Sequence, residues 1–345
     1  MKILSIGWFR SLSSTSLHRH WALQNNSDTI DKIETGLPKI NLWHRIAYHL
    51  FQKGIPIKLP DNTNANKKIK ELVSQNAYDI VWIDKGVTIN KSTLTFIKCK
   101  SPKTRVISYS PDNMVLRHNQ SLNYLQCIPH YDYIFTNKSY ILNEMKNLGA
   151  KNIKFIDNMY EDSFHYPRKL ADIDIKRLGG EVGFVGSWEK ERCESILFLV
   201  KNNIPVKVFG DGKWNDYKGT SPYLTILPAI FSEDYSKALQ AFKISLCFLR
   251  KKNFDQQTTR TMEIPACGGF MLAERTNEHL NLFEEGKEAV YFSSNKELLK
   301  HCKYYLINED ERKKITEAGL KRCQTSGYSN NKSIKKMLDI IKVNE

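Results

Sequence analysis

Short apolar runs that alternate with helical patterns along the whole sequence are the feature that most restricts the fold of this chain. In the first half, the runs rich in β-forming residues are 2–7, 78–84, 105–110, 131–137 and 153–158. Helical patterns lie between them, at about 14–25, 67–76, 91–99, 117–128 and 138–148. Strands that alternate with helices in this way predict parallel α/β domains.

A second alternation follows after a break. The segment 160–180 lacks a clear period and contains Pro167, Gly179 and Gly180, which favours a linker. Beyond it, strands are expected at 181–185, 205–209, 223–227, 244–249, 269–273 and 289–292. The expected helices are 189–202, 233–241, 259–267, 277–284, 295–307, 309–323 and 330–343.

The length of 345 residues exceeds that of a usual single domain. We therefore expect an N-terminal domain of residues 1–165 and a C-terminal domain of residues 166–327. The last helix, in about 328–345, is expected to pack back on the first domain.

The composition is that of a soluble protein, with 41% hydrophobic and 26% charged residues. No run approaches the roughly 18 apolar residues of a membrane-spanning helix, and the N-terminal apolar run is soon broken by Gly7 and Arg10. A cytoplasmic location is expected. The seven cysteines include no C-x2-C pair and the nine histidines show no ligand spacing, so we expect neither a disulfide framework nor a bound metal or other cofactor.

The net charge of +15 is uneven. Residues 1–170 carry 24 Lys and Arg against 13 Asp and Glu, whereas residues 171–345 carry 28 against 24. This excess fits either a solvated lysine-rich surface or an anionic partner such as membrane phospholipid or a diphosphate-linked acceptor. The lysines are scattered and not interleaved with aromatic residues on one segment, so nucleic acid is not expected as a partner.

Ligands of parallel sheets bind beyond the carboxyl ends of the strands, which directs attention to the loops there. In "EVGFVGSWEKER", Gly186 and Ser187 follow a strand, Ser187 is expected to cap the next helix, and Lys190 or Arg192 adds charge suited to a phosphate. The pair Gly210-Asp211 follows the next strand. It is either a simple turn or a loop beside a nucleotide base.

The stretch "FDQQTTRTMEIPACGGFMLAE" contains two acids, Asp255 and Glu263, eight positions apart. Thr258 or Thr259 is expected to cap a helix that Pro265 makes short or kinked. A carboxylate on such a helix can accept hydrogen bonds from both hydroxyls of a ribose. Residue types alone leave open that both acids are merely exposed to solvent.

Several pieces of the sequence resemble the CgeB-like (spore-maturation type) glycosyltransferases of the GT-B superfamily. The most specific are "VGFVGSWEKER", "IPVKVFGDGKW" and "TTRTMEIPACGGFMLAERTNEHLNLFEEGKEAVYFSS". "YDIVWIDKG", "VISYSPDN" and "YDYIFTNKSY" extend the resemblance over nearly the whole chain. It implies two Rossmann-like domains that face each other across a cleft, with the nucleotide-sugar donor on the C-terminal domain and the acceptor on the N-terminal one.

The resemblance also implies roles for individual residues. Retaining GT-B enzymes have a Glu-x7-Glu motif whose second Glu contacts the ribose and whose first contacts the donor sugar. Glu263 and Asp255 have this spacing, with Asp in place of the first Glu, which leaves the stereochemical outcome open. Arg260 is implied to lie near the diphosphate and to stabilise the leaving group.

The acceptor side is expected at the ends of two strands in the first half. Asp84 and Lys85 follow one strand, and Ser110, Asp112 and Asn113 follow the next. In an inverting enzyme Asp112 or Asp84 is the candidate base for the acceptor hydroxyl, whereas a retaining enzyme needs no such base.

The expected function is therefore metal-independent transfer of a sugar from a nucleotide diphosphate sugar, most simply a UDP-sugar. The expected acceptor is a glycan or a lipid-diphosphate-linked precursor of a cell-surface polysaccharide or glycoconjugate. The basic first half suggests peripheral contact with the inner face of an anionic membrane. The alternatives are a nucleotide-sugar epimerase of the same fold, and a non-catalytic protein that binds a nucleotide sugar or nucleic acid.

Overall fold

The protein folds into two compact units. The structure, a computed structural model, describes residues 1–36 and 41–343. The N-terminal unit comprises Met1–Asp157 and the chain from Asn330 onward, and the C-terminal unit comprises Asn158–Ser329. The chain first passes between them at 157/158, upstream of the expected position at 165/166. The segment 160–180 therefore belongs to the C-terminal unit, where part of it forms the unexpected helix α7 (Asp172–Leu178).

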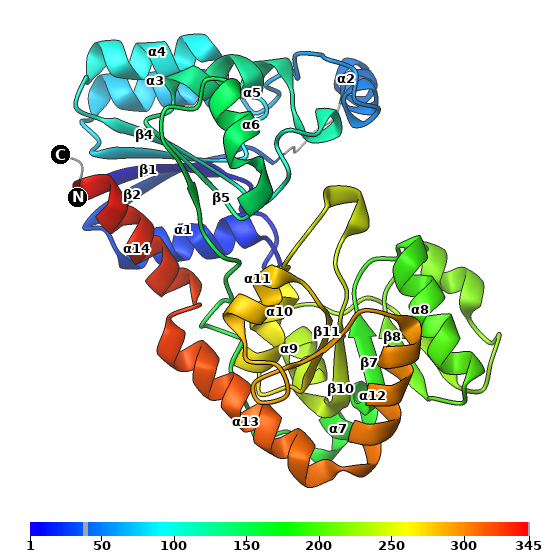
Figure 1. The fold of residues 1–345 in the computed structure, drawn as a ribbon. Coiled ribbons are helices and arrows are strands. Elements are labelled where there is room, and N and C mark those ends of the chain that lie inside the picture. Colours follow the sequence, from blue (N-terminus) through cyan, green and yellow to red (C-terminus); the bar gives the residue numbers. More distant parts are fainter. Residues whose placement is uncertain (37–40, 344–345) are drawn as a thin grey trace. The chain divides into compact units, whose positions relative to one another are not determined.

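A parallel sheet with the strand order β2-β1-β3-β4-β5-β6 forms the middle of the N-terminal unit (Figure 1). The chain adds β2 on one side of β1 and all later strands on the other, so the order reverses between β1 and β3. A reversal of this kind opens a crevice at the carboxyl ends of the two strands. The strands are β1 (Lys2–Gly7), β2 (Thr29–Glu34), β3 (Ile80–Asp84), β4 (Arg105–Ser110), β5 (Tyr133–Thr136) and β6 (Ile153–Phe155).

Helices connect these strands and cover the sheet. They are α1 (Thr15–Asn25), α2 (Leu42–Gln52), α3 (Ala65–Gln75), α4 (Lys91–Lys100), α5 (Leu122–Cys127) and α6 (Leu142–Asn147), with the short 3-10 segments η1 (Arg117–Asn119), η2 (Ile128–His130) and η3 (Ser139–Ile141). The sequence pattern had indicated neither β2 nor α2. In the edge strand β2 only Ile33 is buried, so it lacks the apolar run that marks the inner strands.

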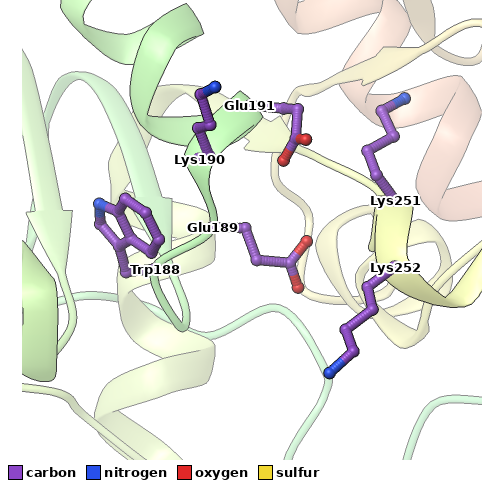
Figure 2. Close-up of a pocket in the computed structure, with 6 residues that line it drawn as sticks. All are labelled: Trp188, Glu189, Lys190, Glu191, Lys251 and Lys252. Atoms are coloured by element: carbon purple, nitrogen blue, oxygen red, sulfur yellow. The ribbon is translucent and has the colours of Figure 1, made fainter.

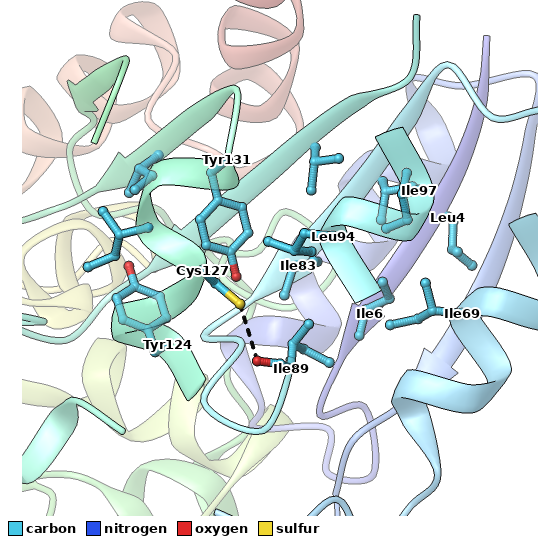
Figure 3. Close-up of a cluster of buried hydrophobic side chains, with 14 of the residues drawn as sticks. Leu4, Ile6, Ile69, Ile83, Ile89, Leu94, Ile97, Tyr124, Cys127 and Tyr131 are labelled. Atoms are coloured by element: carbon cyan, nitrogen blue, oxygen red, sulfur yellow. Dashed lines mark hydrogen bonds between the residues drawn. The ribbon is translucent and has the colours of Figure 1, made fainter. Parts of the chain in front are cut away.

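Aliphatic side chains of the inner strands and of the helices packed on them form the core of the N-terminal unit (Figure 3). Leu4 and Ile83 from the sheet and Ile97 from α4 are fully buried. The Cys127 thiol donates a hydrogen bond of 3.3 Å to the carbonyl of Ile89. All seven cysteines are free thiols, and Cys99 alone among them is exposed.

The sheet of the C-terminal unit has the order β12-β11-β10-β7-β8-β9 and is also parallel. Counted within this unit, the order is 6-5-4-1-2-3, that of dinucleotide-binding domains, and it reverses between β7 and β10. The strands are β7 (Gly180–Val185), β8 (Val206–Phe209), β9 (Leu224–Leu227), β10 (Phe242–Cys247), β11 (Met271–Glu274) and β12 (Val290–Phe292). The loops after β7 and β10 are therefore the first place to search for a ligand site.

The other helices of this unit agree closely with the expected ranges. They are α8 (Lys190–Lys201), α9 (Ser232–Ala241), α10 (Thr259–Ala266), α11 (Asn277–Leu282), α12 (Asn295–Ile307) and α13 (Glu309–Ser326), with 3-10 segments η4 (Gly212–Tyr217) and η5 (Lys251–Asn253). As Pro265 predicts, α10 is short, with eight residues.

The last helix, α14 (Asn330–Val343), lies alongside α1 in the N-terminal unit (Figure 1). The Asn26 side chain donates a hydrogen bond of 2.7 Å to Oδ1 of Asn331. Ile334, Met337 and Ile341 are buried. A segment at the end of the chain thus completes a unit that begins at residue 1.

Candidate active site

The turn after β7 is held in place by the neighbouring strand and by an indole. The Gly186 N–H donates to the carbonyl of Phe209, and the Gly186 carbonyl accepts a hydrogen bond of 2.9 Å from Trp214 Nε1. The N–H groups of Ser187 and Trp188 donate to no acceptor within the part of the chain that the structure describes. Ser187 does not cap α8, because the turn continues to Glu189, which is the N-cap residue.

Two guanidinium groups meet at the end of β7. Arg260, in the first turn of α10, donates to the carbonyl of Val185 over 2.7 Å, and its Cζ lies 5.4 Å from the ring centre of Phe184. Arg192 approaches the same ring at 5.8 Å and donates to the carbonyl of Ser187. Burial and the nearby charge of Arg260 lower the pKa of Arg192 to about 10. Like charges held this close attract an anion to the point where they meet.

The two cations differ in how they are neutralised. Arg192 lies 3.6 Å from Glu189, but its buried Nε has no hydrogen-bond partner in 1–36 and 41–343. Arg260 has no carboxylate partner in the same described ranges. Gly186 lets Arg260 come this close, because a Cβ at that position would lie only 2.4 Å from Arg260 Nη2. The glycine after β7 and the arginine after β10 thus meet where the strand order reverses.

Glu263 is buried one helical turn further along α10, with 7% of its surface exposed. Its Oε2 accepts a hydrogen bond of 2.5 Å from the Tyr235 hydroxyl, and its Oε1 lies 3.9 Å from Nε2 of His165. His165 Nδ1 accepts the N–H of Glu161, so the proton of the neutral ring is on Nε2, on the Glu263 side. Burial, with a contribution from Arg168, lowers the pKa of His165 to about 3. The Tyr235 hydroxyl therefore orients this carboxylate, and the neutral His165 ring lies beside it.

The start of α10 is anchored to β11 through a chain of hydrogen bonds. The N-cap residue Thr258 donates its N–H to Thr261 Oγ1, which lies 2.8 Å from His279 Nε2. His279 Nδ1 lies 2.6 Å from the Glu274 carbonyl. A carbonyl can only accept, so Nδ1 carries the ring proton and Nε2 accepts from the Thr261 hydroxyl. Burial lowers the pKa of His279 to about 4, which keeps this direction of donation at neutral pH.

The remaining donor-side candidates lie on the adjoining loops. Asp255 is half-buried in the loop between β10 and α10, where its N–H donates to the Arg250 carbonyl. Thr259 is the first residue of α10. In the loop after β8, Asp211 Oδ1 accepts the N–H of Ala229 at 3.3 Å. Gly210 is packed so tightly that an added Cβ would lie 2.6 Å from the Gly186 carbonyl oxygen.

A pocket of about 400 Å³ lies between the β7–α8 turn and η5 (Figure 2). Lys190 lines this pocket, and its side chain is exposed to solvent. Its Nζ lies 3.9 Å from Oε1 of Glu194 on the same helix. The other lining residues are Trp188, Glu189, Glu191, Lys251 and Lys252. The Nζ of Lys213 lies 4.6 Å from the Trp188 ring centre, which adds a further cation to this region.

In the N-terminal unit, the acceptor-side candidates gather at the ends of β3 and β4. Asp84 is buried and accepts two hydrogen bonds from Arg19 of α1, of 2.9 and 2.6 Å. Lys85 lies 2.5 Å from Asp112. An acceptor hydroxyl would have to displace a salt bridge to reach either carboxylate, an obstacle to the base role that the sequence suggested for both.

The side chains of Ser110 and Asn113 accept hydrogen bonds from backbone N–H groups of the loop after β4. Ser110 Oγ accepts the N–H of Asp112 at 3.3 Å, and Asn113 Oδ1 accepts the N–H of Val115 at 3.1 Å. Arg19 and Asp84 follow β1 and β3, the two strands between which the order reverses. This unit therefore also places a buried charged pair at its reversal point.

The residues that the sequence did not single out are Arg19, His165, Trp214, Tyr235 and His279. Each lies near a site partner 18 to 98 positions away in the sequence, so no local spacing marks these residues. A weak signal exists for Trp214, since a large aromatic residue in a polar glycine-containing loop usually packs on something.

Comparisons with known proteins agree with this architecture. Residues 192–339 match a family model described as glycosyl transferase-like. The structure of HepE from Anabaena in complex with UDP-glucose aligns with a TM-score of 0.65 at 13% identity, over 98% of this chain and 99% of that one. Sucrose-phosphate synthase from Thermosynechococcus elongatus aligns with a TM-score of 0.69 at 10% identity, over 99% and 98%. The chain has the GT-B fold.

A third solved structure with this fold is a putative UDP-N-acetylglucosamine 2-epimerase from Listeria monocytogenes. It aligns with a lower TM-score of 0.55 at 13% identity, over 100% of this chain and 96% of that one. The search of curated proteins found no match. Identities this low establish the fold but not the activity.

Two general features concern metals and membranes. The described residues contain no cluster of His, Cys, Asp and Glu side chains that would bind a metal ion. None of their helices combines the length and the apolar composition that crossing a bilayer requires.

Proposed function

We propose that this protein is a glycosyltransferase, of the CgeB-like type, that transfers a sugar from a UDP-sugar to a glycan or a lipid-diphosphate-linked acceptor. The observation that carries the proposal is the pair of guanidinium groups of Arg260 and Arg192 at the β7/β10 reversal point. They lie beside the N–H groups of Ser187 and Trp188. This arrangement suits a diphosphate, with cations for its charge and backbone donors for its oxygens.

The donor would lie across the loops of the C-terminal unit. Arg260 and Arg192 hold the diphosphate and stabilise the negative charge that develops on it as the glycosidic bond breaks. Glu263, oriented by Tyr235, accepts hydrogen bonds from the ribose hydroxyls. Asp255 contacts the donor sugar. The nucleotide base would lie near Gly210 and Asp211. Lys190 would add positive charge at the edge of the site.

The acceptor would be bound by the N-terminal unit, near the residues that follow β3 and β4. The excess of cations in residues 1–170 supports an acceptor that carries phosphate, or one presented at an anionic membrane on its cytoplasmic face. We propose that the reaction serves polysaccharide or glycoconjugate synthesis at the cell surface and that it needs no bound metal.

A thermal-shift comparison of nucleotides tests the donor site. UDP at about 100 times its dissociation constant should add about 2.7 kcal/mol of apparent stability. For a unit of this size, that corresponds to a rise in Tm of roughly 5–10 °C. Arg260→Ala should abolish most of the rise. Lys243→Ala should not, because Lys243 is an exposed cation near the amino end of β10, whereas the site lies beyond the carboxyl ends of the strands.

The screen includes GDP, CDP and dTDP, together with the corresponding nucleotide sugars. If none of these ligands raised the Tm of the wild type, a nucleotide-sugar activity would be wrong. If Arg260→Ala responded like the wild type, the assignment of the diphosphate site would be wrong. Conversion of a UDP-sugar to its epimer without any acceptor would identify the protein as an epimerase instead.

A further inference from the structure

Helix α2 has one face packed on the N-terminal unit and one face in solvent. His44, Ala47 and Phe51 are buried, at the spacing of a single helical face. The side chains of Leu42, Trp43 and Ile46 lie on the other side, with 72%, 56% and 43% of their surface exposed. Ile55, just after the helix, is 44% exposed. Apolar side chains of this size, gathered on one short segment, form a surface that a partner would cover.

The segment that carries this surface has charges of one sign. Residues 41–60 contain Arg45, Lys53 and Lys58 and no Asp or Glu. All three cations are exposed. The 3-10 segment η1 packs against the helix, and a Cβ at Gly54 would lie 3.2 Å from Cβ of Arg117. Exposed cations therefore lie on the same segment as the exposed apolar side chains.

We infer that the solvent face of α2 docks the protein on an anionic phospholipid bilayer. Leu42, Trp43 and Ile46 enter the region between headgroups and acyl chains, and Arg45 and Lys53 stay at the phosphates. Tryptophan is the side chain that prefers this interface. The inference extends the proposed membrane contact to a named surface.

A second copy of the chain is a poorer occupant. In a symmetric dimer through this face, Arg45 and Lys53 of one copy would face the same residues of the other, because a two-fold interface pairs a patch with itself. Residues 41–60 offer no carboxylate to neutralise them. An anionic lipid surface supplies the missing negative charge and an apolar interior together.

Vesicle co-sedimentation of the full chain, without nucleotide, tests the inference. Vesicles of phosphatidylcholine and phosphatidylglycerol in equal amounts should bind the wild type, and added salt should weaken the binding. Trp43→Ser with Ile46→Ser should lower the partition constant at least tenfold. Arg45→Glu with Lys53→Glu should lower it by more than about 25-fold, because each lost cation near an anionic surface costs about fivefold.

Two matched controls separate this surface from general effects. Lys100→Glu with Lys103→Glu makes the same change in net charge on and beside α4 and should bind nearly as the wild type does. Ile307→Ser removes an exposed apolar side chain from α12 of the other unit and should also leave binding unchanged. All variants replace exposed residues, and UDP-induced thermal shifts report whether they remain folded and competent. Since vesicle binding needs no donor, its loss would not count against the donor site.

Brominated acyl chains give a second, local readout, since they quench only indoles that enter the bilayer. Quenching in the wild type should decrease in Trp43→Phe, which still binds. Three results would overturn the inference: binding equal to wild type in both α2 double variants, equal binding to pure phosphatidylcholine, or a dimer in solution that Trp43→Ser converts to a monomer.

Discussion

Replacing Gly186 with alanine tests whether the close approach of Arg260 to the β7 turn matters for donor binding. The new methyl group would lie 2.4 Å from Arg260 Nη2, 3.1 Å from its Cζ and 3.0 Å from the Phe184 ring. Comfortable contacts are about 3.5–4.0 Å, so the end of the guanidinium must move by about 1 Å. Gly186 also has a φ of +157°, which side chains rarely adopt, so the substitution strains the turn in addition to displacing the guanidinium.

The expected loss follows from the contact that moves. A hydrogen bond between a charged donor and its acceptor contributes about 1.5–3 kcal/mol. Displacing Arg260 from a diphosphate should therefore raise the dissociation constant of UDP about 10- to 100-fold. Isothermal titration calorimetry measures this constant directly, and urea unfolding checks separately that the C-terminal unit remains stable.

A double-mutant cycle shows whether the glycine acts through the arginine. If it does, Gly186→Ala with Arg260→Ala should bind UDP as weakly as Arg260→Ala alone, whereas independent effects would multiply. Gly219→Ala is the control for adding a Cβ at a positive φ: its φ is +72°, and no atom lies within 4 Å of the new Cβ. A dissociation constant for Gly186→Ala within twofold of the wild-type value would refute the reasoning.

Three further predictions concern the buried polar groups. Tyr235→Phe removes the 2.5 Å hydrogen bond to Glu263 and should lower the free energy of unfolding by about 1.5–3 kcal/mol and weaken UDP binding; unchanged urea midpoints would contradict this. His279 has a pKa lowered to about 4, so only the unfolded chain takes up its proton below pH 6.5. Stability is therefore complete above that pH and falls toward pH 4, by about 2 kcal/mol at pH 5, and His279→Gln should remove this part of the acid sensitivity in urea titrations. Arg19→Met leaves Asp84 buried without its cation and should cost about 3–5 kcal/mol in urea unfolding; adding Asp84→Leu should recover much of it, and no recovery would argue against the pairing.

Much of the fold could be predicted because its inner strands are buried on both faces. Strand β3 is an apolar run as far as Ile83, and β10 is buried throughout from Ile244 onward. Such a run between helices has few other structures available. The polar edge strand β2 and the short helix α7 lacked such a pattern. Helix α2 was missed as well, since its apolar residues lie on both faces and obscure the period.

For the site, the sequence predicted which loops carry it and which residue types lie on them, but not which residues contact one another. Parallel topology placed the candidates at the carboxyl ends of strands, but strand order decides which loops meet, and order depends on contacts distant in sequence. The sequence indicated Glu263 without its partner Tyr235, 28 positions earlier. It also indicated Asp84 and Asp112 as candidate bases. It did not show that Asp84 forms a salt bridge with Arg19, or Asp112 with Lys85.

The return of α14 to the N-terminal unit has a consequence for the order in which the protein is completed during synthesis. The ribosome makes residues 1–157 first, yet α1 acquires its neighbour α14 only after residues 158–329 have been made. At 5–20 residues per second, that interval is roughly ten to thirty seconds. The C-terminal unit, contiguous in sequence, can finish folding in the meantime. The part of the chain made first is therefore the last to be completed, and until then the apolar surface that α14 covers is open to chaperones.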